Sequence, residues 1–248
     1  MTAALELSAD DREEQIAALR RRLAAVPGKG AGAHAVEVAR PVPVLPVPEV
    51  LAELLPQRGL TRGSVVSVAG ASSLLVGLIA SVTADGGWAA VVGRPSFGML
   101  AALEMGADLR RVVLVPEPGP DAVDVAAVLL DGMDLVVLDL SDTSGAAVTP
   151  SRARGVTARA RHRGAVLVVT GGGWPGAELE LHARIDGCTG LGRGHGRLQS
   201  RELSVRVRGR GQAAQPRGRR VQLCSRDGQG FAVRWQAADQ YSTERMAQ

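Results

Sequence analysis

Aromatic residues make up only 2% of this 248-residue chain, and Lys29 is its single lysine. We therefore expect a core of packed leucine, valine and alanine side chains. The two cysteines, Cys188 and Cys224, form neither a disulfide framework nor metal-ligand spacing, which indicates buried thiols in a reducing compartment. The sequence predicts no metal site and no cofactor. Apolar residues still reach 46%, which excludes wholesale disorder.

A membrane span or a signal peptide is not predicted either. Met1 is followed by a polar, charged segment, unlike a signal peptide. Residues 63–84 carry no charge and are long enough to cross a bilayer, but Gly70, Ser72 and Ser73 interrupt the run. We interpret this stretch as strand, loop and helix in a soluble, cytoplasmic protein without membrane contact.

Charge is distributed unevenly around a net value of +4. Residues 151–248 contain 18 basic and 7 acidic side chains, whereas residues 1–150 contain 11 and 18. A basic C-terminal part indicates an anionic partner, most simply nucleic acid. An arginine-rich, solvated surface explains the same distribution about equally well.

The N-terminal residues predict a helix over 8–26 with a narrow apolar seam that includes Ile16, Leu19 and Leu23. This seam either docks on its own domain or binds a partner helix. Gly/Pro-rich residues follow and predict a semi-rigid linker. The expected organisation is an N-terminal helix (1–27), a linker (28–47), a core (48–212), and a basic C-terminal hairpin and tail (213–248).

Between residues 49 and 170, apolar strands alternate with helices, which is typical of an α/β fold with a mainly parallel sheet covered by helices on both faces. After Gly171, the pattern of apolar residues changes to one in every two positions. Leu203, Val205 and Val207 alternate with polar residues, and a second alternating run includes Val233 and Trp235. We expect these segments to form antiparallel strands that extend the sheet, with arginines on the exposed face. The expected strands are 64–69, 88–92, 111–115, 135–140 and 165–170, and the expected helices are 49–55, 73–83, 99–105, 121–130 and 151–163.

The segment from Gly70 to Gly77 follows a strand and opens a helix, which is where a phosphate-binding loop belongs. A working loop needs a second glycine, a lysine and a Ser/Thr, but this chain has Leu75, Val76 and Gly77 in those places. Losing the charged groups removes the stabilisation of a transferring phosphoryl group. Nucleotide hydrolysis is therefore not expected. The residues of this degenerate nucleotide site are Gly70, Ser72, Ser73 and Asp139, the last ending a strand as a magnesium-orienting aspartate would.

Arginines supply two candidate surfaces for DNA or a protein partner. Arg193, His195 and Arg197 are separated by glycines, which let main-chain amides approach a phosphate backbone. A tight turn that needs flexible residues explains this run as well. Few aromatics are available to stack on bases, so any DNA contact is expected to be salt-sensitive and made to the backbone. The second cluster, which partner docking or a solvated sheet edge explains equally well, comprises Arg206, Arg208, Arg210, Arg217, Arg219 and Arg220.

Several motifs together resemble a RecA-type core over residues 48–210. Arg58-Gly59-Leu60, Gly63 to Val66, Gly70 and the Ser72-Ser73 pair are similar to its beginning. The strand 88–92 with Met105 to Asp108 is similar to its next strand and helix, Asp134–Asp139 to its Walker B strand, and Val166–Thr170 to the strand before its second DNA-binding loop. More narrowly, the run from Leu191 to Arg197 and the arginine-rich tail resemble the actinobacterial ImuA-type proteins, RecA-like accessory proteins of the damage-induced translesion mutasome.

The chain also departs from active RecA proteins. Arg94 stands in place of their catalytic glutamate, Gly171 in place of their nucleotide-sensing glutamine, and both DNA loops are too short. The resemblance implies a non-catalytic scaffold that joins the ImuB-type adaptor, a polymerase homologue, and indirectly an error-prone C-family DNA polymerase, with possible contacts to DNA. The alternatives are a RecA-superfamily ATPase, a DNA-binding module acting alone and an inhibitor of cell division.

Overall fold

The computed structural model describes residues 42–141, 148–192, 195–210, 216–225 and 232–238. The chain divides into two units, residues 1–41 and residues 42–248, so every described residue belongs to the second unit. The predicted helix over 8–26, with Ile16, Leu19 and Leu23, lies outside the described residues.

Within the described ranges, nine strands form one mixed sheet. Their bounds are β3 (Val65–Gly70), β4 (Ala89–Val92), β5 (Val112–Val115), β6 (Leu135–Asp139), β7 (Val166–Thr170), β8 (Leu179–Gly192), β9 (His195–Gly209), β10 (Arg217–Ser225) and β11 (Val233–Ala237). Their order is β11-β10-β9-β8-β3-β7-β6-β4-β5. The strands from β8 to β5 pair in parallel, and those from β8 to β11 pair antiparallel. The predicted mainly parallel sheet with antiparallel C-terminal strands is thus confirmed.

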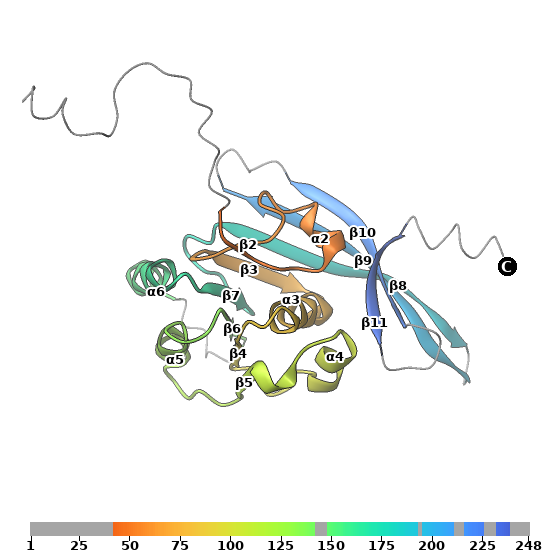
Figure 1. Cartoon of the computed structure of the whole chain (residues 1–248), viewed down its shortest axis with the longest axis horizontal. Helices are drawn as coiled ribbons and strands as arrows, with labels where there is room; N and C mark the ends of the chain where they lie inside the picture. Colours follow the sequence, from red (N-terminus) through yellow and green to blue (C-terminus); the bar gives the residue numbers. More distant parts are fainter. Residues whose placement is uncertain (1–41, 142–147, 193–194, 211–215, 226–231, 239–248) are drawn as a thin grey trace, which may run out of the picture. The chain divides into compact units, whose positions relative to one another are not determined.

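Helices cover both faces of the parallel part (Figure 1). On one face lie α3 (Ser72–Ala84) and α4 (Met99–Glu104), and on the other lie α5 (Ala122–Leu129) and α6 (Pro150–Arg163). Each face has its own leucine-, valine- and alanine-rich cluster, because the parallel strands are apolar on both sides. A small antiparallel pair, β1 (Val44–Leu45) with β2 (Leu60–Thr61), and the short helix α2 (Glu49–Ala52) complete the α3 side.

The uncharged stretch over 63–84 divides into β3 and α3, as its sequence predicts. Ten of the thirteen residues of helix α3 are buried, between the sheet, α4 and β11, so the helix has almost no solvent-exposed side. Among the described residues, no helix combines the length and the apolar character needed to cross a bilayer.

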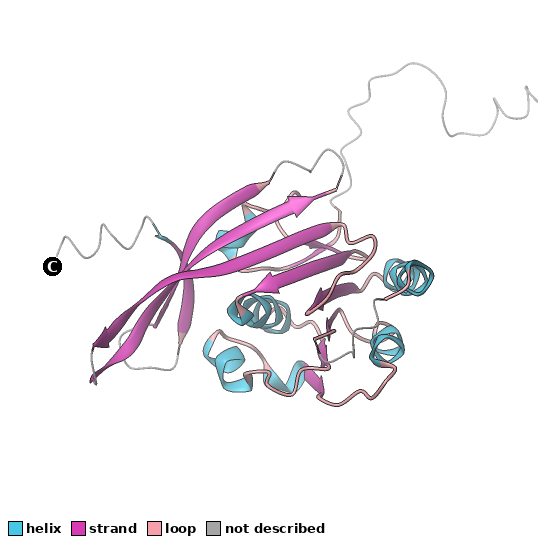
Figure 2. Ribbon diagram, turned by 180° about the vertical axis from the view of Figure 1, so that it is seen from behind, coloured by secondary structure: helices cyan, strands magenta, loops and turns pink. Residues whose placement is uncertain are grey.

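The antiparallel strands form a long extension of the sheet (Figure 2). Strands β8 and β9 contain 14 and 15 residues. Leu203, Val205 and Val207 of β9 are buried and belong to the cluster on the α3 side. Strand β11 brings Trp235 against α3, where a Cβ added to Gly77 would lie 2.7 Å from the Trp235 ring. The extension is therefore packed onto α3, the helix that begins at the predicted nucleotide site.

Candidate functional site

A single residue, Ala71, connects the end of β3 to the start of α3. The amide of Ala71 donates a hydrogen bond to the Ala183 carbonyl on β8, 2.8 Å away. Leu74, Leu75 and Val76 are already buried in the helix. The segment from Gly70 to Gly77 thus follows a strand and opens a helix as predicted, but it leaves no stretch of loop to wrap around a phosphate.

Gly70 explains how so short a connection is possible. Its φ is +90°, a conformation that glycine adopts at little cost. An added Cβ would lie only 1.9 Å from the Ala183 carbonyl oxygen. The glycine that opens the expected phosphate loop is therefore required here for the close approach of β3 and β8.

Arg94 connects two residues of the predicted nucleotide site, Ser72 and Asp139. Its guanidinium donates to the Asp139 carboxylate across 2.5 Å and to the Ser72 hydroxyl across 2.7 Å. Asp139 is only 5% exposed, and its other carboxylate oxygen accepts the Ser141 amide at 2.9 Å. Because a buried carboxylate is costly unless paired, this arginine supplies the compensating charge from within the chain.

Gly93 and Gly171 pack tightly against Asp139. A Cβ on Gly171 would lie 2.4 Å from the Asp139 carboxylate and 2.2 Å from the Ser141 hydroxyl. A Cβ on Gly93 would lie 2.8 Å from the Asp139 carbonyl oxygen. A longer side chain at position 171, such as a nucleotide-sensing glutamine, would displace these groups.

The Arg94 cluster, formed by Ser72, Arg94 and Asp139, lies where ligands usually bind in such folds. It sits at the carboxyl ends of β4 and β6 and at the start of α3, and the helices that follow β3 and β6 lie on opposite faces of the sheet. Its positive and negative charges already satisfy each other. An arginine remains protonated at neutral pH and cannot act as a base. No group of three or more metal-ligating side chains occurs among the described residues.

The candidate arginines divide between the two faces of the antiparallel extension. Arg206, Arg208 and Arg220 are exposed and alternate with buried residues of β9 and β10, so they lie on the face turned away from α3. Arg184 of β8 is exposed and shares that face. Arg217 and Arg219 alternate the other way, and Arg219 forms an ion pair with Glu53 beside α2.

We call the exposed arginines Arg184, Arg206, Arg208 and Arg220 the arginine face. This face is not purely cationic, because Glu180 and Glu202 are also exposed on it and Asp186 lies beside Arg184. The Ser204 hydroxyl, then Arg184 and Arg220, hold the pKa of Asp186 below its usual range. His195 and Arg197 begin β9 at the end of the β8–β9 hairpin, Arg210 follows β9 and is exposed, and Arg193 lies outside the described residues.

Sequence reasoning missed two features of this region. It singled out Arg94 and Asp139 separately, but nothing in their 45-residue separation predicts that the two side chains meet. It also omitted β8, although Leu179, Leu181 and Ala183 alternate with exposed polar residues as in other half-buried strands. That alternation was the available signal.

Comparison with known proteins places the chain in a family. Residues 53–176 match the model of the MT3502 N-terminal domain. The chain is also 44% identical, over 219 residues, to the Mycobacterium tuberculosis protein named uncharacterized protein Rv3395c, covering 85% of this chain and all of the relative. The chain belongs to the MT3502 N-terminal domain family. The matched region runs from the end of α2 past β7 and therefore includes the whole Arg94 cluster.

We expect R94A to destabilise the fold by about 3 kcal/mol, because it leaves Asp139 buried without its charge partner. This is at the low end for buried pairs, since the Arg94 side chain is 20% exposed. The double variant R94A/D139A should lose less than the sum of the two single variants. Urea unfolding measures the free energy of unfolding of all three variants. R110A is the control, because the Arg110 side chain is 90% exposed. Additive losses would show that the two side chains do not interact.

Proposed function

We propose that this chain is a non-catalytic, RecA-like scaffold of the ImuA/ImuB translesion DNA synthesis complex and supports damage-induced mutagenesis through protein contacts. The observation that carries the proposal is the Arg94 cluster. In a nucleotide-using relative, the start of α3 and the aspartate at the end of β6 would face a phosphate and its magnesium ion. In this chain, an internal guanidinium links those two groups.

The elements that carry the RecA resemblance support this interpretation by their arrangement. Strand β3 and helix α3 correspond to the phosphate-binding segment, and β6 corresponds to the Walker B strand. These elements meet beside the Arg94 cluster, where the one-residue connection and the tight packing at Gly171 leave little room for a triphosphate. A RecA-like domain without the catalytic groups would act by binding other molecules, so we assign its function to its surfaces.

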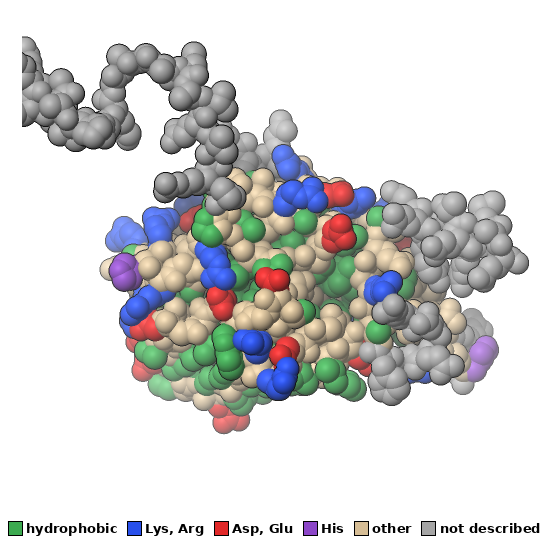
Figure 3. All heavy atoms as spheres, in the orientation of Figure 1, with side chains coloured by type: hydrophobic (Ala, Val, Ile, Leu, Met, Phe, Trp, Pro, Cys, Tyr) green, Lys and Arg blue, Asp and Glu red, His purple; other side chains and the backbone are tan. Residues whose placement is uncertain are grey.

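The open edge at β5 is the surface best suited to a protein partner. Strand β5 ends the sheet, so one side of its backbone lacks a neighbouring strand within the described part of the chain. Exposed apolar side chains flank it, and Figure 3 shows such side chains gathered where Figure 1 places α5, β5 and α4. They are Leu100 and Leu103 of α4, Leu114 of β5 and Val128 of α5. We assign this edge to the ImuB-type adaptor, through which the C-family polymerase would join indirectly.

The arginine face supports a second candidate function, which is direct contact with DNA. Its four exposed arginines lie on neighbouring strands, and no helix of the described residues is packed over them. Phosphate contacts of this kind need no base recognition. In this proposal the protein is cytoplasmic and becomes nucleoid-associated when it is engaged.

Calorimetric titration with ATP and magnesium should detect no binding at micromolar protein concentrations. The physical reason is that the chain has no lysine in this region and its aspartate is already paired. The R94A variant should not bind ATP either, since the one-residue connection is unchanged. Micromolar ATP affinity in the unmodified chain would overturn the scaffold and restore the ATPase alternative.

A complex with the ImuB-type adaptor should form at micromolar concentration and weaken about tenfold or more in the variant L103E/L114E, because apolar anchors dominate protein interfaces. Size-exclusion chromatography and calorimetry measure this complex. L191E is the matched control, since Leu191 is a 61% exposed leucine on the β8–β9 hairpin, away from β5. Absence of any complex would count against the scaffold. Equal weakening by L191E would count against the β5 edge.

DNA binding through the arginine face should depend steeply on salt, and R206A/R208A should lower both the affinity and the slope of that dependence. Each lost phosphate contact reduces the slope of log affinity against log salt by about 0.9 for double-stranded DNA. Fluorescence anisotropy at several salt concentrations measures it. R110A/R154A is the control, because it removes two exposed arginines from other elements. A flat slope in the unmodified chain would dispose of this second candidate.

A further inference from the structure

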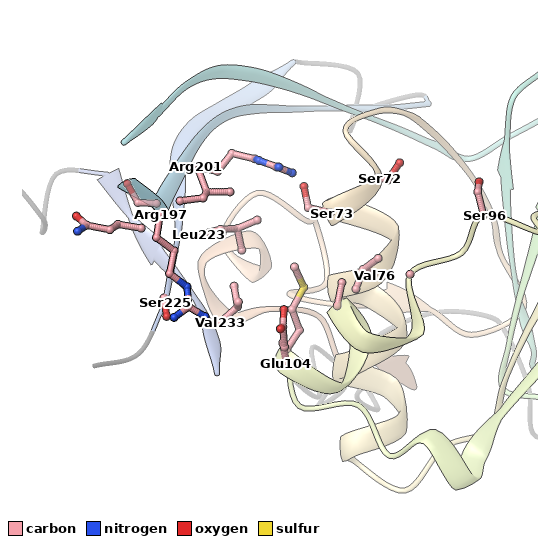
Figure 4. Close-up of a pocket in the computed structure, with 16 residues that line it drawn as sticks. Ser72, Ser73, Val76, Ser96, Glu104, Arg197, Arg201, Leu223, Ser225 and Val233 are labelled. Carbon is pink, nitrogen blue, oxygen red and sulfur yellow. The ribbon is translucent and has the colours of Figure 1, made fainter. Parts of the chain in front are cut away.

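A pocket of about 500 Å³ lies between the start of α3, helix α4 and the antiparallel strands (Figure 4). This volume is within the range of small-molecule sites. One wall comes from α3, α4 and the segment before α4, and the other comes from β9, β10 and β11. Neither Arg94 nor Asp139 lines it, so it is a different site from the Arg94 cluster, although Ser72 borders both.

Ser73 lines this pocket and carries an unpaired hydroxyl group. The residue is 7% exposed, and its Oγ atom is buried with no hydrogen-bond partner among the described residues. Leaving a buried hydroxyl unpaired costs free energy, and a bound acceptor would recover it. Ser73 also lies in the first turn of α3, a helix whose start has no side-chain cap and whose first amides favour a negative charge.

Arg201 supplies a cation opposite the start of the helix. It lies two residues before the buried Leu203 on β9, which puts it on the α3 side of the sheet. Figure 4 shows its guanidinium extending toward Ser73. The Arg201 side chain forms no ion pair or hydrogen bond with any described residue, although it is partly buried. Such a group is positioned for an external anion.

The remainder of the pocket is aliphatic. Val76 and Met105 line one side, and Leu223 and Val233 line the other. None of the described residues in the lining is aromatic, so the pocket offers no ring on which a nucleobase could stack. Arg197 adds a second positive charge, and Glu104 is the one acidic residue in this described lining. A ligand that fits has one anionic end and a flexible aliphatic body.

We propose that this pocket binds a small organic anion, an aliphatic chain that ends in a carboxylate or phosphate group. The anionic group contacts Ser73, Arg201 and the first amides of α3, and the chain lies against Val76 and Leu223. The site goes beyond the scaffold role, because it requires neither the ImuB-type adaptor nor DNA.

The test is a titration of the full chain with octanoate and octyl phosphate, followed by calorimetry and by amide chemical shifts of residues 72–76 and 197–201. Octanol lacks the anionic group, and inorganic phosphate lacks the aliphatic chain. Each should bind about tenfold more weakly or worse, because the first loses a charged hydrogen bond and the second loses the buried chain. A preference for octyl phosphate or for octanoate identifies which headgroup the site takes.

Two variants separate a ligand contact from a structural role. S73A should weaken binding several-fold while leaving the unfolding midpoint unchanged or higher, because it removes an unsatisfied buried hydroxyl. R201Q should weaken binding about tenfold or more. R217Q is the matched control, an exposed arginine of β10 that does not line the pocket. No binding of either octyl compound at millimolar concentration, or binding that S73A and R201Q leave unchanged, would overturn the proposal.

Discussion

The buried carboxylate of Asp139 is the constraint on which the candidate site depends. It ends a strand that is inaccessible on both faces, so its charge must be balanced nearby. Arg94, just after β4, provides that balance and at the same time holds the Ser72 hydroxyl at the start of α3. One guanidinium therefore ties three elements together. Because the cation is part of the chain, folding alone satisfies the carboxylate, and no bound ion or nucleotide is needed for that purpose.

The short connection after β3 and the arginine bridge depend on each other. A phosphate-binding loop would separate the strand from the helix by several residues. Here Gly70, at positive φ, and Ala71 turn the chain directly into α3. This places Ser72 within reach of Arg94. The glycine pattern that resembles a nucleotide motif thus has a packing explanation at two positions, since Gly77 also leaves room for Trp235.

The sequence predicted the elements well where one physical signal dominated. Uninterrupted apolar runs identified β4, β6 and β7, because strands buried on both faces tolerate little else. Such local signals could not predict which strands and side chains meet when they are far apart in the sequence. The bridge from Arg94 to Asp139 and the approach of Arg201 to the start of α3 depend on which strands become neighbours, and residue spacing carries no record of that order. Strand β8 was missed because its glycines obscured an alternation that was present.

The alternation of β9 explains how one strand can serve two surfaces. Odd positions such as Arg201 and Leu203 face α3 and contribute to the pocket or the core. Even positions such as Arg206 and Arg208 face solvent on the opposite side. A shift of the β9 register by one residue would exchange the two sets, burying arginines and exposing leucine and valine. The pairing of β9 with β8 and β10 therefore fixes the pocket and the arginine face together, so a change that disturbs this register should affect both surfaces at once.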